Sequence, residues 1–133
     1  MNNFSNPYFL IIESDVIPPQ SLLQQFECAT SELDLTEAGW GMVGAIYYQG
    51  FHNYAFDTHD TFLERTNHCL SGCTVYKREL IRKYPFRYDP ENLGPFPDAF
   101  MSYDAGHDFA LWNDHRIICD HLHINGARMS RNL

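Results

Sequence analysis

The chain has 133 residues, of which 44% are hydrophobic and 15% aromatic, a composition typical of one globular domain rather than a disordered chain. A formal net charge of -8 argues against nucleic-acid binding, which needs a basic face to displace counterions. The apolar runs are far shorter than the ~20 residues of a transmembrane helix, and no basic-then-apolar leader is present. We therefore expect a cytoplasmic protein with no transmembrane segment, whose four cysteines are reduced thiols.

The first half of the chain predicts two strands and a helix. Residues 8–16 form a short apolar run that ends in an acidic turn, as expected of a buried strand. Pro18-Pro19 suits the first turn of a helix, because the missing N–H costs nothing there. We expect this helix to reach about Leu33, and its apolar face to consist of Leu22, Phe26, Ala29 and Leu33. Residues 39–48, punctuated by glycine, predict the next buried strand.

The second half of the chain is less regular. Residues 49–66 show no clear periodicity, which indicates irregular structure or a hairpin. A strand that ends near Tyr76 and a short helix over 77–84 follow. Residues 88–97 hold three prolines and a glycine and predict a loop. The last predictions are a helix or pair of helices over 98–114, with Asp98 as N-cap, and a strand over 116–124.

The alternation of strands and helices indicates an α/β fold with a largely parallel sheet. No internal repeat, low-complexity segment or interdomain linker interrupts the chain. We therefore expect residues 1–133 to form a single domain.

Two acids follow the first predicted strand. Ligands of open α/β sheets gather at the carboxyl ends of the strands, where Glu13 and Asp15 are expected to lie. Side chains at i and i+2 of an extended segment project to the same side, and hard divalent cations prefer oxygen ligands. The pair therefore predicts a metal site. The alternative is that both acids merely meet the positive end of the following helix dipole.

A second cluster lies in the C-terminal "CDHLHING". Cys119, His121 and His123 alternate on a predicted strand and would share one face. The two histidines could bind a metal, and Cys69, Cys73 and Cys119 could supply thiolates for zinc. The spacings match no familiar zinc finger or ribbon, so we favour buried cysteines with surface histidines.

The segment "SYDAGHDF" contains Asp104 and Asp108, four residues apart. On a helix these two carboxylates would share a face. One of them could act as a general base if it faced a cleft. The alternative is a solvated acidic face.

The order of these segments resembles the GT-A-fold nucleotide-sugar glycosyltransferases, in particular the inverting family 2. An apolar strand that ends in a variant of the D-x-D motif comes first, and a glycine-containing strand, a strand–basic helix segment, an acidic helix and a late histidine follow. The matching stretches are "YFLIIESDVIPP", "GMVGAIYY", "SGCTVYKRELIRKYPFRYDPE", "SYDAGHDFALW" and "HRIICDHLHING". The resemblance runs from about Tyr8 to Gly126. It implies a partial GT-A, Rossmann-like mixed sheet with flanking helices that lacks the N-terminal nucleotide-binding half.

The resemblance implies a metal site. Glu13 and Asp15 would hold a divalent cation, Mn²⁺ or Mg²⁺, that bridges the diphosphate of a nucleotide-sugar donor. His123 would be the late histidine that completes the site, and His121 is the competing candidate.

The resemblance also implies how the acceptor is handled. Asp104 would take the proton from the acceptor hydroxyl, and Asp108 is the second candidate for this base. The expected acceptor-binding residues are Ser71, Gly72, Cys73 and Trp112.

We therefore expect a glycosyltransferase-like protein that is a fragment of a longer enzyme or needs a partner chain. An edge strand left without its neighbour would expose backbone and apolar surface, which predicts self-association or partner binding. One alternative is a non-catalytic binding or assembly module built on the same half-fold. The other is a zinc-binding protein.

Overall fold

The computed structural model describes residues 7–47, 62–67, 69, 72–86, 97–122 and 128–129. Three helices flank a sheet: α1 (Leu22–Thr36), α2 (Arg78–Lys83) and α3 (Pro97–Ala105). The strands are β1 (Tyr8–Ile12), β2 (Val16–Ile17), β3 (Trp40–Tyr47), β4 (Leu63–Thr66), β5 (Cys73–Lys77), β6 (Ala110–Leu122) and β7 (Arg128–Met129). Each of the three helices is too short or too polar to span a bilayer.

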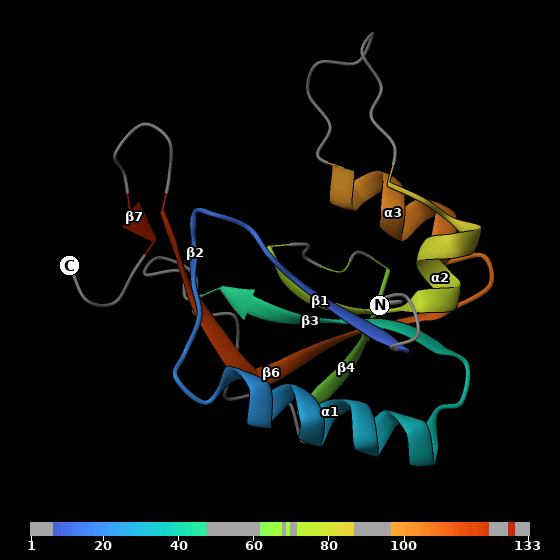
Figure 1. Cartoon of the computed structure of the whole chain (residues 1–133), viewed down its shortest axis with the longest axis horizontal. Helices are drawn as coiled ribbons and strands as arrows, with labels where there is room; N and C mark the ends of the chain where they lie inside the picture. The colour runs from blue at the N-terminus through green and yellow to red at the C-terminus, as the bar shows by residue number, and fades with distance from the viewer. Residues whose placement is uncertain are drawn as a thin grey trace, which may run out of the picture.

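The described strands form one mixed sheet in the order β1-β5-β3-β6-β2, with β4 and β7 also paired to β6 (Figure 1). The pairing of β3 with β6 is parallel, and the other described pairings are antiparallel. The expectation of a largely parallel sheet is therefore wrong, because β5 lies between β1 and β3 and runs against both. As a consequence β1, β3 and β6 run in one direction and end at the same edge of the sheet.

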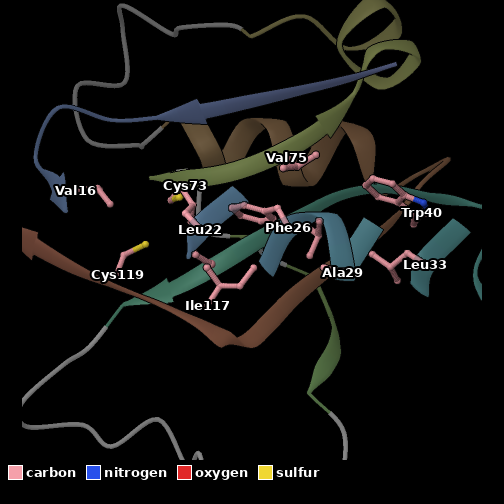
Figure 2. Close-up of a cluster of buried hydrophobic side chains, with 12 residues drawn as sticks. Val16, Leu22, Phe26, Ala29, Leu33, Trp40, Cys73, Val75, Ile117 and Cys119 are labelled. Carbon is pink, nitrogen blue, oxygen red and sulfur yellow. The ribbon is translucent and has the colours of Figure 1, made fainter. Parts of the chain in front are cut away.

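The helix α1 covers one face of the sheet. Its buried apolar residues are Leu22, Phe26, Ala29 and Leu33, which confirms the predicted face. They pack on side chains from four strands, and we call the whole group the α1 cluster (Figure 2). The sheet residues of this cluster are Val16, Trp40, Val43, Ala45, Cys73, Val75, Ile117 and Cys119.

The helices α2 and α3 cover the opposite face (Figure 1). Successive side chains of a strand point to opposite faces, so neighbours of the α1 cluster along each strand face this second layer. We call this group the α2/α3 cluster; its buried residues are Met42, Cys69, Tyr76, Leu80, Met101, Ala105 and Leu111. The chain therefore has three layers, helix, sheet and helices, with a core on each side of the sheet.

Most element boundaries up to residue 84 are close to those predicted. The predicted strands over 39–48 and up to Tyr76 are confirmed as β3 and β5, and the short helix over 77–84 as α2. The first predicted strand is too long, because β1 ends at Ile12 and a turn separates it from β2. The helix α1 begins at Leu22 rather than at the prolines, and the amide of Leu22 donates to the carbonyl of Pro19.

The prediction for residues 98–114 is partly wrong. The helix α3 begins at Pro97, so Asp98 lies inside it and is not its N-cap. It ends at Ala105, and the amide of Gly106 closes the last turn on the carbonyl of Ser102. Residues 110–114 belong to β6, where β3 and β4 pair with them on both sides. Pairing with two strands outweighs the local helical pattern. Of the loop predicted over 88–97, residues 88–96 lie outside the described residues and Pro97 begins α3 instead. Most of 49–66 also lies outside the described residues.

The C-terminal part of α1 is anchored to the sheet by Asp34. Its carboxylate accepts hydrogen bonds from the Tyr8 hydroxyl and from Trp40 Nε1, the latter at 2.9 Å. The hydrogen bond to Asp34 raises the pKa of Tyr8 to about 12. The ammonium of Lys77 lies 4.6 Å from the centre of the Trp40 ring. One carboxylate thus links α1 to β1 and β3.

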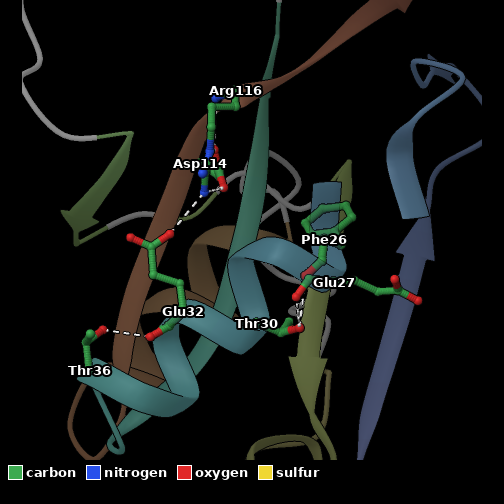
Figure 3. A network of polar contacts seen from close by, with 7 residues as sticks. All are labelled: Phe26, Glu27, Thr30, Glu32, Thr36, Asp114 and Arg116. Atoms are coloured by element: carbon green, nitrogen blue, oxygen red, sulfur yellow. Dashed lines mark hydrogen bonds and ion pairs between the residues drawn. The ribbon is translucent and has the colours of Figure 1, made fainter. Parts of the chain in front are cut away.

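A second polar network links α1 to β6 (Figure 3). Asp114 is fully buried and accepts hydrogen bonds from the backbone and guanidinium of Arg116 at 2.7–3.0 Å. Arg116 also reaches Glu32 on α1, at 3.3 Å. The register passes from Ala45↔Asp114 to Ile46↔Ile118, so β6 carries a bulge here. The bulge lets Arg116 fold back on Asp114, which compensates the buried charge.

Two leucines of α1 give a matched test of this core. Leu33 is 1% exposed and Leu35 is 88% exposed. We expect Leu33→Ala to lower the free energy of unfolding by about 2–5 kcal/mol, because a cavity is left in the α1 cluster. We expect Leu35→Ala to change it by less than about 0.5 kcal/mol. Urea denaturation of both variants measures the difference, and equal effects would contradict this packing of α1.

Candidate functional site

Residues from five strands, β1, β2, β3, β5 and β6, meet at one edge of the sheet. The strands β1, β3 and β6 end there, and β5 begins there, as the arrows in Figure 2 show. We call this the site edge; it comprises residues 12–16, 47, 72–73 and 119–121. The carboxyl ends of parallel strands are where open α/β sheets bind their ligands.

The two acids lie in a turn of residues 13–15 between β1 and β2, here called the acid turn. The amide of Glu13 donates to the carbonyl of Gly72 at 2.8 Å, and the amide of Val16 donates to the carbonyl of Glu13 at 3.1 Å. The side chain of Glu13 is exposed and that of Asp15 is half-buried. Hydrogen bonds therefore fix the backbone of the turn, while the side chains of Glu13 and Asp15 are at least partly exposed to solvent.

Tyr47, the last residue of β3, lies beside the acid turn. It pairs with Cys119 of β6, and its ring packs against the α1 cluster. Its hydroxyl oxygen accepts a hydrogen bond from the amide of Gly72. Burial raises the pKa of the Tyr47 phenol, and the charges of Glu13 and Asp15 raise it further. The phenol thus lies within electrostatic range of the two carboxylates.

Gly72 leaves no room for a side chain. A Cβ atom at this position would lie 1.5 Å from the Tyr47 hydroxyl oxygen and 2.9 Å from Cγ2 of Val16. Glycine is required here because the backbone approaches Tyr47 closely. The resemblance implies that Gly72 borders the acceptor pocket, and the structure places it between Tyr47 and the acid turn.

Two buried thiols lie at the same edge. Cys73 and Cys119 are free cysteines in the α1 cluster. The Cys119 thiol donates to the sulfur of Cys73, which lowers the pKa of Cys73 and raises that of Cys119. Cys69 belongs to the α2/α3 cluster instead, and its amide donates to the Ser102 hydroxyl at 3.0 Å. The structure therefore does not bring together the three cysteines of the zinc hypothesis.

The structure describes the predicted histidine ligands only in part. The backbone of His121 pairs with Val16, directly after the acid turn, and its side chain lies outside the described part. His123 lies outside the described residues altogether. Within the described ranges, no group of three or more His, Cys, Asp or Glu side chains is arranged to hold a metal. Metal binding by Glu13 and Asp15, like that by the histidines, therefore stays a prediction.

The two candidate bases lie in different local structures. Asp104 is half-buried on α3. Asp108 follows the helix in a turn, so the two do not share a helix face as predicted. Asp108 forms an ion pair with Lys83 at 2.5 Å and accepts a hydrogen bond from the Tyr84 hydroxyl, and both contacts lower its pKa.

The helix α3 is hydrogen-bonded to Cys69. The Ser102 hydroxyl accepts the amide of Cys69 at 3.0 Å, and the Cys69 thiol donates to the carbonyl of Trp112 at 3.3 Å. Cys69 precedes Gly72 by three residues, which span at most about 11 Å. Ser71 lies outside the described residues.

Trp112 lies within the sheet, away from the site edge. It pairs with Val43 of β3 and with Arg65 of β4, whose guanidinium is 5.9 Å from the indole centre. Val43 precedes Tyr47 by four residues, which is about 13 Å along a strand. The structure therefore does not bring this predicted acceptor-binding residue to the acids.

Comparisons with known proteins give a fold and no family. No family model and no curated protein matches the chain. The solved structure of A197 from STIV, a viral protein, is similar over 96% of this chain, with a TM-score of 0.61 and 18% sequence identity. The chain spans 64% of the length of A197. The chain thus shares an α/β fold with A197, with a mixed sheet and a few helices.

Sequence reasoning missed Tyr47. Its position at the end of a predicted buried strand was the available signal, since such ends gather at the ligand-binding edge. Aromatic residues at strand ends are usually core, and nothing in the local sequence of Tyr47 indicates its contact with Gly72, 25 residues away.

Two glycines give a matched test of the contact between Gly72 and Tyr47. We expect Gly72→Ala to destabilise the fold by about 1–3 kcal/mol, because the new methyl group overlaps the Tyr47 hydroxyl. At Gly39 a Cβ would meet nothing within 4 Å, so Gly39→Ala should change stability by less than about 0.5 kcal/mol. Thermal or urea unfolding compares the two, and a harmless Gly72→Ala would contradict the described site edge.

Proposed function

We propose that this chain is a glycosyltransferase-like protein, the metal- and acceptor-binding half of a GT-A-type enzyme. In this proposal it transfers a sugar from a nucleotide-diphosphate donor to an acceptor hydroxyl. The observation that carries the proposal is the acid turn, whose two carboxylates lie where β1, β3 and β6 end. A second segment or chain would bind the base and ribose of the donor.

The donor set fits a divalent cation. Glu13 and Asp15 are two carboxylates separated by one residue in the acid turn, and hard divalent cations prefer oxygen ligands of this kind. Mn²⁺ or Mg²⁺, when bound, would neutralise the charge that develops on the leaving diphosphate. Glu13 and Asp15 would hold and orient this cation.

The backbone pairing supports a histidine ligand from β6. His121 lies opposite Val16, and residues paired across antiparallel strands have Cα atoms about 4.5–5.5 Å apart. This position is therefore adjacent to the acid turn. His123, which fits the resemblance better, follows two residues later.

Asp104 is the base in this proposal, and Asp108 is the second candidate. Asp108 forms an ion pair with Lys83 and accepts a hydrogen bond from the Tyr84 hydroxyl. Asp104 lies on α3, whose Ser102 accepts the amide of Cys69, three residues before Gly72. Asp104 would take the proton of the acceptor hydroxyl as that oxygen bonds to the sugar carbon and the nucleoside diphosphate leaves.

Calorimetry tests the proposal directly. We expect UDP or GDP to bind in the presence of Mn²⁺ and not in its absence, because the cation joins the diphosphate to the acid turn. Glu13→Gln and Asp15→Asn remove charge with little change of shape and should abolish this binding. Glu79→Gln, on the exposed surface of α2, is the control and should leave it unchanged. Absence of Mn²⁺-dependent binding, or normal binding by Glu13→Gln, would contradict the proposal for this chain.

A specific observation favours the second candidate, a non-catalytic assembly module. Among the described strands, β1 has a neighbour on one side only, β5. The carbonyl of Pro7 and the amide of Glu13 form hydrogen bonds with residues next to β5. In antiparallel pairing every second residue forms such bonds, so the N–H and C=O groups of Tyr8, Leu10 and Ile12 point away from β5. Such an edge can accept another strand.

The occupant that we propose for this edge is β1 of a second copy. The strand "YFLII" carries no charge, so two copies can pair antiparallel without like charges face to face, despite the acidic character of the chain. Its outward donors and acceptors are self-complementary around a two-fold axis. Ile12, at the end of β1, is 42% exposed.

Light scattering after gel filtration tests this dimer. We expect the unmodified chain to run as a dimer and Ile12→Lys to shift it to monomer, because a lysine on an edge strand disfavours pairing. Leu23→Lys places the same charge on an exposed apolar position of α1, 67% exposed, and should leave the dimer intact. A monomeric unmodified chain at high concentration would contradict edge pairing.

A further inference from the structure

We infer that the hydroxyl of Tyr47 is the positioning group of the acid turn, which it holds through Gly72 so that the Glu13 and Asp15 carboxylates keep one arrangement. Tyr47 would act through the cation ligands and not as a ligand itself. The role of Tyr47 toward a divalent cation rests on the proposed function, whereas its contact with Gly72 rests on the geometry of the structure.

Gly72 joins Tyr47 to the acid turn. Its amide donates to the Tyr47 hydroxyl oxygen, and its carbonyl accepts the amide of Glu13 at 2.8 Å. Val16, at the other end of the turn, also contacts this glycine: its Cγ2 atom would lie 2.9 Å from a Cβ built there. Both ends of the acid turn and the Tyr47 hydroxyl therefore lie against the same residue, Gly72.

Tyr47 is well supported for this role. The strand β3 lies inside the sheet, between β5 and β6, and Tyr47 itself pairs with Cys119. Its ring is half-buried against the α1 cluster. The acid turn, in contrast, is three residues long and leads into a strand of only two residues. Functional groups on such turns need fixed neighbours to keep their geometry, and Tyr47 supplies one.

Removing the hydroxyl alone separates positioning from packing. A tyrosine hydroxyl oxygen can accept a hydrogen bond, and that of Tyr47 accepts one from the Gly72 amide. Phenylalanine would keep the ring in the α1 cluster and lose this hydrogen bond.

The first measurement needs no cation. We expect Tyr47→Phe to raise amide hydrogen exchange at Glu13, Val16 and Gly72 about fivefold, the factor that corresponds to one lost hydrogen bond. Exchange within α1 should stay unchanged. Tyr8→Phe is the matched control: it removes a hydroxyl bonded to Asp34, at the other end of β1, and should not affect the three amides. Unchanged exchange in Tyr47→Phe would overturn the inference.

The second measurement uses Mn²⁺ alone, followed by calorimetry or electron paramagnetic resonance. We expect Tyr47→Phe to weaken Mn²⁺ binding at least about tenfold, the usual loss when a group that orients metal ligands is removed. Tyr8→Phe should bind like the unmodified chain. If the unmodified chain binds Mn²⁺ and Tyr47→Phe binds it equally well, the inference alone is overturned. If the unmodified chain does not bind Mn²⁺, the proposed function is overturned, and the positioning role for a cation falls with it.

Discussion

The parallel pairing of β3 with β6, together with β5 running antiparallel between β3 and β1, decides which residues gather at the site edge. It makes β1, β3 and β6 end at one edge of the sheet. The acid turn, the phenol of Tyr47 and the backbone of His121 all belong to this edge because of that single constraint. With β5 elsewhere in the order, Gly72 would not face Glu13, and the acid turn would have no support.

The rest of the molecule keeps this edge fixed. Asp34 anchors α1 to β1 and β3, and Arg116 joins the buried Asp114 of β6 to Glu32 of α1. The fully buried Asp114 carboxylate would be costly without Arg116, so this pair favours one arrangement of helix and sheet. The cores on both faces then hold the strands whose ends carry the carboxylates.

Local patterns predicted the parts of the fold that depend on local periodicity. The face of α1 follows from the spacing of Leu22, Phe26, Ala29 and Leu33, and β3 follows from a buried glycine-containing run. Residues 110–114 were predicted as helix and are strand, because β3 and β4 pair with them from far along the chain. Pairing with strands that are distant in the sequence cannot be predicted from the pattern of a few neighbouring residues.

The candidate site was predicted in part for the same reason. Glu13 and Asp15 were found from their place after an apolar strand, which is a local signal. The contact of Tyr47 with Gly72 joins residues on different strands, and the separation of Cys69 from Cys73 depends on which face each one packs against. Neither could be derived from spacing, because each depends on the completed sheet.

The central claim is that the acid turn binds a divalent cation at the site edge. Paramagnetic line broadening by Mn²⁺ in the NMR spectrum of the amides tests it most directly, because the broadening falls steeply with distance from the ion. The account predicts that Glu13, Asp15, Tyr47 and Gly72 broaden first, while the exposed acidic positions of α1 stay sharp. Broadening that begins at Glu27 or Glu32, or none at all, would contradict it.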